Sequence, residues 1–125
     1  MPPLVRTAVL LMFLAFAFYS VGVWSAFLSR HLDAWHALLF WLGFSADTAG
    51  TELMRQMAGG FRWGFHTATG GLALLLMLTH AVWATTVLAR RDEARLRTFH
   101  RTSVMVWVIW LIPFVTGLIA GSRRM

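Results

Sequence analysis

Two histidines stand in a segment that is otherwise almost wholly apolar, from Phe65 to Ala84. His66 and His80 have 13 residues between them. In an α-helix they would share one face, roughly 21 Å apart along the axis. That face also carries Met77 and three small residues that leave room for a flat macrocycle, Gly70, Ala73 and Ala84. The separation is comparable to that of two haems stacked across a bilayer. The alternative is close helix packing, with both histidines hydrogen-bonded to neighbouring helices.

A third histidine, His100, lies beyond the turn expected near Arg91. Residues equidistant from the turn of a helical hairpin are neighbours, so His80 and His100 are expected to meet. Their imidazoles are candidates for both axial ligands of one haem, or for two ligands of a metal ion. The alternative interpretation is that His100 is an interfacial histidine in the basic segment RTFHRT.

The ligand expected at the opposite end is His66, where Met54 and Glu52 fall at a similar depth. His66 is a candidate sole axial ligand of the haem iron. It could also pair with Met54, or meet its own copy in a homodimer. A histidine and methionine pair would raise the reduction potential of the iron. Simple packing of Met54 is the alternative.

The second apolar run carries Asp47 near its middle, where a carboxylate costs about 2.5–3.5 kcal/mol in a membrane. We expect it to face the interior, to be protonated, or to accept hydrogen bonds from hydroxyls such as Thr48 or Thr51. Its role would be to orient a ligand histidine or handle a proton, or only to bond two helices together. His36 is a reserve ligand, and Trp107 is expected to pack on a cofactor.

Composition indicates a membrane protein of one domain spanning residues 1–125, since 58% of residues are hydrophobic and only 13% are charged. The chain has no cysteine, which excludes disulfides, thiolate metal sites and covalently attached haem. Its 11 basic residues are all arginines at the ends of apolar runs. That position is typical of membrane proteins, so we expect no nucleic-acid partner despite the net charge of +6.

Four apolar runs predict transmembrane helices at about 7–28, 36–57, 63–89 and 98–121. The first run is interpreted as a span and not as a signal peptide. Asp33 and Asp92 are expected N-caps of the second and fourth helices. The short connections predict antiparallel neighbours, hence an all-α, integral membrane four-helix up-down bundle. Arginines balance at the two ends, so orientation in the bilayer is not predicted.

Three segments resemble the HsmA family of small four-span, haem-sensing bacterial membrane proteins. They are ADTAGTELM (residues 46–54), HTATGGLALLLMLTHAVWA (66–84) and FHRTSVMVWVIWLIPFVTG (99–117). The resemblance extends from the first span to Gly117. It implies a haem-responsive role in the bacterial inner (cytoplasmic) membrane, and it supplies no established ligand residues.

The leading hypothesis is a multi-pass protein that binds haem b, one or two per chain, to sense or sequester it, and that forms a homodimer. A first alternative is a di-haem b-type cytochrome that passes electrons across the membrane from a quinol. A second is a cofactor-free or metal-binding small membrane protein. No hydrolytic or phosphate-binding motif is present in the sequence, so enzyme activity of the chain by itself is not expected.

Overall fold

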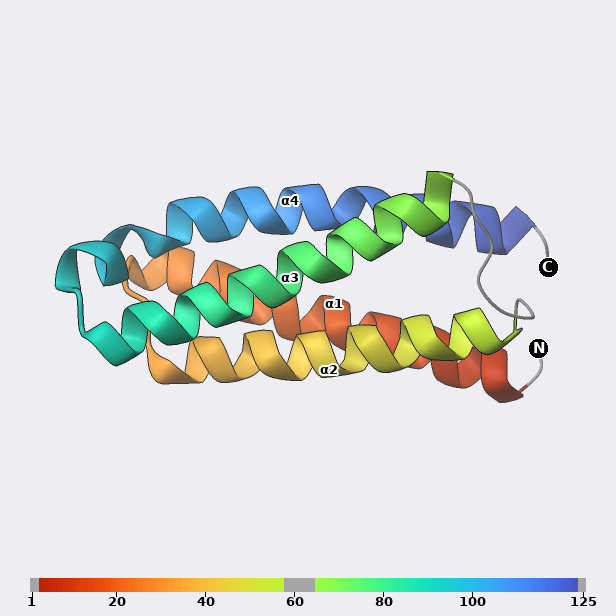
Figure 1. Ribbon diagram of the computed structural model, residues 1–125, viewed down its shortest axis with the longest axis horizontal. Coiled ribbons are helices and arrows are strands. Elements are labelled where there is room, and N and C mark those ends of the chain that lie inside the picture. Colours follow the sequence, from red (N-terminus) through yellow and green to blue (C-terminus); the bar gives the residue numbers. More distant parts are fainter. Residues whose placement is uncertain (1–2, 58–64, 124–125) are drawn as a thin grey trace.

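A computed structural model describes residues 3–57 and 65–123 of the chain. It contains four helices in these ranges, which confirms the predicted all-α architecture: α1 (Pro3–Ser29), α2 (Ala34–Met57), α3 (Phe65–Arg90) and α4 (Glu93–Arg123). The helices run up and down, and α1 packs against both α2 and α4 (Figure 1). The arrangement is therefore a ring of four helices in which α3 contacts α2 and α4.

Three of the described helices are long and apolar enough to cross a membrane: Pro3–Ser29, Gly70–Arg90 and Glu93–Gly117. Helix α2 does not belong to this group. It carries polar residues along its length, among them His36, Asp47 and Glu52, which lower its mean hydropathy.

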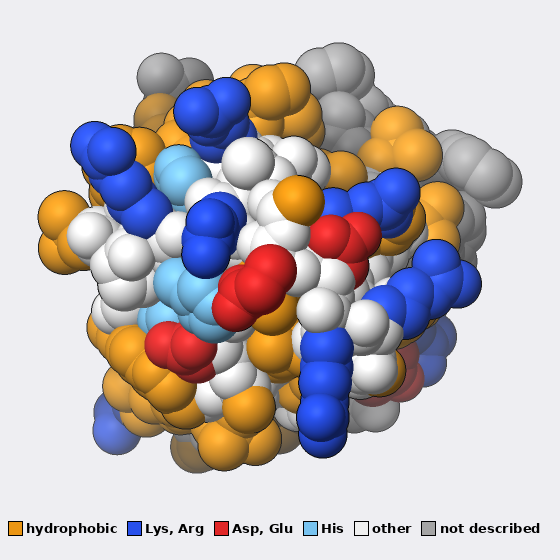
Figure 2. Space-filling view, turned by 90° about the vertical axis from the view of Figure 1, so that its left-hand side faces the viewer, with side chains coloured by type: hydrophobic (Ala, Val, Ile, Leu, Met, Phe, Trp, Pro, Cys, Tyr) orange, Lys and Arg blue, Asp and Glu red, His pale blue; other side chains and the backbone are white. Residues whose placement is uncertain are grey.

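The two turns at one end of the bundle are joined to each other. The backbone N–H of Leu32 donates to the carbonyl of Leu96 at 2.9 Å, which ties the α1–α2 turn to the first turns of α4. Asp92 caps α4 as predicted, since its Oδ1 accepts the N–H of Arg95 at 3.3 Å. Figure 2 shows this end, where arginine, acidic and histidine side chains gather within an apolar rim.

Asp33 occupies the predicted N-cap position of α2, but its carboxylate does not make the capping bond. Its carbonyl accepts the N–H groups of His36 and Ala37, which starts the helix. Its own N–H donates to Nδ1 of His36 at 2.9 Å. His36 therefore stands in the place of the glutamate of a capping box, three residues after the N-cap.

Small residues let α1 and α2 approach closely. A Cβ at Gly22 would lie 2.8 Å from the ring of Phe40, and one at Gly43 would lie 2.5 Å from the ring of Tyr19. Tyr19 is fully buried, so its ring has no room to move aside. Glycine at position 43 is therefore needed for the helices to pack as they do.

We predict that Gly43→Ala lowers the free energy of unfolding by about 1–3 kcal/mol, because the new methyl group overpacks the Tyr19 ring. Unfolding in mixed detergent micelles, followed by circular dichroism, measures the loss. Gly71→Ala is the matched control, because nothing lies within 4 Å of a Cβ built there. Equal stability of the wild type and Gly43→Ala would contradict the described packing of α1 on α2.

Candidate functional site

Three histidines are buried in the bundle. The exposed fractions of His36, His80 and His100 are 0%, 4% and 9%. Each has one buried ring nitrogen without a hydrogen-bond partner, namely His36 Nε2, His80 Nδ1 and His100 Nδ1. A buried polar atom without a partner costs about 1–3 kcal/mol. These nitrogens are therefore the atoms at which a ligand would gain most.

His80 lies in the core, where it joins three helices. Its Nε2 is hydrogen-bonded to the Ser103 hydroxyl of α4 at 2.6 Å. Its ring packs against Phe40 of α2 at 4.3 Å and against Phe99 of α4 at 5.4 Å, measured between ring centroids. The imidazole nitrogen that usually binds haem iron is thus engaged by Ser103, and two neighbouring aromatic rings pack against the histidine.

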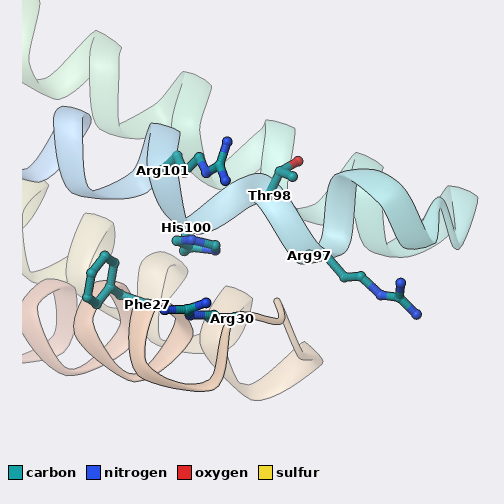
Figure 3. A pocket seen from close by; sticks show the side chains of 6 residues that line it. All are labelled: Phe27, Arg30, Arg97, Thr98, His100 and Arg101. Carbon is teal, nitrogen blue, oxygen red and sulfur yellow. The ribbon is translucent and has the colours of Figure 1, made fainter.

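His100 faces a different direction, toward α1. Its ring meets the edge of Phe27 at a centroid distance of 5.6 Å. It lines an open groove of about 520 Å³ between α1 and α4. The residues around this groove are Phe27, Arg30, Arg97, Thr98, His100 and Arg101 (Figure 3). In Figure 3, His100 projects from α4 toward α1, while Phe27 and Arg30 project from α1 toward α4.

The described contacts of His80 and His100 thus involve different partners. Distance from the turn predicts a similar depth for both residues but does not fix the directions of their side chains. Adjacent residues of an α-helix point about 100° apart. Phe99 takes the direction toward His80, so its neighbour His100 turns toward α1.

Asp47 accepts two hydrogen bonds in the centre of the bundle. The Tyr19 hydroxyl of α1 donates to Oδ2 at 3.2 Å, and Nε1 of Trp110 in α4 donates to the same oxygen at 3.0 Å. Asp47 is 3% exposed. The carboxylate therefore links α2 to two other helices through donors that sequence reasoning missed, in place of the expected Thr48 or Thr51. Its described partners include no histidine.

The remaining expected ligand residues occupy varied surroundings. Met77 is 1% exposed and packs in the core beside Trp110, whereas Met54 is 37% exposed. Nothing lies within 4 Å of a Cβ built at Gly70. Nε1 of Trp107 donates to the Ser20 hydroxyl at 3.0 Å. The side chain of His66 lies outside the described part of the chain.

His31 forms an ion-pair cluster on the polar end. Its Nδ1 lies 2.9 Å from Asp33 Oδ1, and its Nε2 lies 3.2 Å from Glu93 Oε2. The hydrogen bond to Asp33, reinforced by Glu93, raises the pKa of His31 above its ordinary value of 6.5. This cluster joins the α1–α2 turn to the start of α4. Sequence analysis did not foresee Glu93 as a partner, because the two residues are far apart in the chain.

Within residues 3–57 and 65–123, no three histidine or carboxylate side chains come together as a metal site. Comparisons of the chain with protein-family models, curated proteins and solved structures found no match.

We predict that Tyr19→Phe destabilises the protein by about 1–3 kcal/mol, because the buried Asp47 carboxylate loses one of its two donors. Unfolding in mixed micelles measures the effect. Thr79→Val is the control, since the Thr79 hydroxyl only bonds the Leu75 carbonyl of its own helix at an exposed position. If both substitutions had the same small effect, Asp47 would not depend on Tyr19.

The His31 cluster predicts a pH-dependent contribution to stability. Because the folded protein raises the pKa of His31, the contribution is complete below pH 6.5 and is lost as the pH rises through the higher folded value. The cluster is partly exposed, so it contributes at most about 1 kcal/mol. The melting temperatures of wild type and His31→Gln, compared between about pH 5 and pH 9, should converge with rising pH. A constant difference would rule out titration of His31 as the cause.

Proposed function

We propose that the chain is an integral membrane protein that binds haem b without covalent attachment, and that it senses or sequesters haem. The observation that supports this most directly is His100. It is a buried imidazole with an unpartnered nitrogen, and it lines an open groove whose other residues suit a porphyrin. The resemblance to HsmA proteins agrees with this role and favours the bacterial inner membrane as the location.

The outer surface supports insertion in a bilayer. Large apolar side chains cover it, for example Leu10, Leu28 and Leu72, with exposed fractions of 64%, 80% and 66%. Extensive exposure of large apolar side chains is typical of a surface that contacts lipid or another protein. If α1 and α3 cross in the same direction, α2 must return the chain between them. Its most costly polar side chains, His36 and Asp47, are buried inside the bundle.

The residues around the α1/α4 groove fit haem in three respects. Its volume of about 520 Å³ lies within the range of small-molecule sites, roughly 300–1,000 Å³. His100 offers an axial nitrogen, and Phe27 offers an apolar wall. Guanidinium groups such as Arg30 suit the propionate carboxylates. Bound haem would supply an iron that takes axial ligands and changes oxidation state.

One chain offers one histidine at this groove, His100. Engaging His80 through Nε2 as well would require breaking its bond to Ser103, and its ring is packed against Phe40 and Phe99. A homodimer with two grooves facing each other would instead supply a second imidazole. The di-haem alternative depends on a separate site at His66.

The test is haem titration of the purified protein, followed by absorption spectroscopy and a count of haem per chain. We predict that His100→Ala weakens haem affinity at least about 10-fold and diminishes the Soret band, because the axial nitrogen is removed. His31→Ala is the matched control, a histidine at the same end that does not line the groove. It should bind haem as the wild type does.

Other outcomes separate the alternatives. Loss of haem in His80→Ala but not in His100→Ala would move the site into the core. A count of two haems, with one lost in His66→Ala, would favour transmembrane electron transfer. Protein that stays colourless after haem is supplied would contradict haem binding and leave the cofactor-free or metal-binding alternative.

A further inference from the structure

The three arginines at the α1/α4 groove have no acidic partner among the described residues. The chain has five acidic residues, and the structure describes all of them. Each is engaged elsewhere: Asp33 and Glu93 with His31, Asp47 with Tyr19 and Trp110, Glu52 with Arg55, and Asp92 with Arg95. None pairs with Arg30, Arg97 or Arg101, so the charge at the groove is left for an anion from outside the chain.

Arg30 has an unfavourable backbone conformation. Its φ of 53° is left-handed, and it follows the last residue of α1, where glycine is the usual residue. A non-glycine residue there costs about 1–2 kcal/mol. Arg91 has the same conformation, with a φ of 52°, after the end of α3. Arg30 lines the groove and Arg91 does not, which provides a matched pair for experiment.

The groove is lined by both apolar and cationic side chains. Phe27 lies one turn deeper along α1 than Arg30. Arg97 and Arg101 are one helical turn apart on α4, on either side of His100 in the sequence, and both project away from its ring (Figure 3). A matching ligand has a broad apolar body and anionic groups along one edge.

We propose that this groove selects tetrapyrroles that carry free carboxylates, with Arg30 as the main carboxylate-binding residue and Arg97 and Arg101 assisting at the rim. The inference rests on the proposed haem function and adds the ligand class. Guanidinium groups form charge-assisted, often bidentate hydrogen bonds with carboxylates, and an esterified carboxyl group cannot form them. Recognition through the carboxylates needs no iron, so the metal-free porphyrin is also a ligand.

The experiment compares haem b, protoporphyrin IX and protoporphyrin IX dimethyl ester as ligands of the full chain in nanodiscs of neutral phosphatidylcholine. Absorption and fluorescence titrations measure each Kd. In the wild type, the dimethyl ester should bind at least about 10-fold more weakly than the free acid. Arg30→Gly should weaken the free acid to the affinity of the ester and leave the ester unchanged. Arg91→Gly should change neither.

Glycine readily adopts the left-handed conformation of positions 30 and 91, so neither substitution strains the backbone. Thermal unfolding checks that both variants are folded. Arg101→Gln serves as a second variant and should reduce the preference for the free acid. Equal binding of free acid and ester in the wild type, while haem still binds, would overturn the carboxylate selection but not the haem function. If no porphyrin bound at all, both the carboxylate selection and the proposed haem function would be overturned.

An anionic lipid phosphate is the competing occupant of the groove. Nanodiscs containing phosphatidylglycerol test it. If Arg30→Gly altered only retention of phosphatidylglycerol, with the porphyrin Kd values unchanged, the groove would be a lipid headgroup site and the proposal would be overturned.

Discussion

The Asp47 carboxylate, which accepts hydrogen bonds from Tyr19 and Trp110 on one oxygen, is the interaction on which the packing of this bundle depends. An unsolvated carboxylate is costly in an apolar interior, so the three helices that satisfy it are held in one rotation about their axes. Tyr19 in turn fills the space above Gly43, and Trp110 packs on the rings around it. The direction of each neighbouring side chain, including those on the groove, follows from that rotation.

The histidines at the polar end of the bundle have different roles. His31 and His36 organise the turns, the first through carboxylates and the second as a helix cap. His100 has neither of these roles, and it lines the α1/α4 groove instead. Similar residue types at one end of the protein therefore differ in their surroundings, and only His100 combines burial, an unpartnered nitrogen and an adjacent open groove.

The helices and the cap at Asp92 could be predicted, because apolar runs and N-cap residues are local signals. The partners of Asp47 could not. They lie 28 and 63 positions away in the chain, and helix α1 is apolar on all sides, so its sequence does not indicate which face turns inward. The same limit applies to His80 and His100. Distance from a turn gives depth, whereas packing of Phe99 decides the direction. Their pairing in one site stays a prediction.

The walls of the α1/α4 groove are the first and last of the four described helices. Translation delivers α1 before α4, with the residues of α2 and α3 between them. The groove consequently comes into existence only when α4 docks against α1. A nascent or truncated chain that lacks α4 has no such surface, so any ligand of the groove would meet only protein in which α4 has docked, and its binding would report that docking.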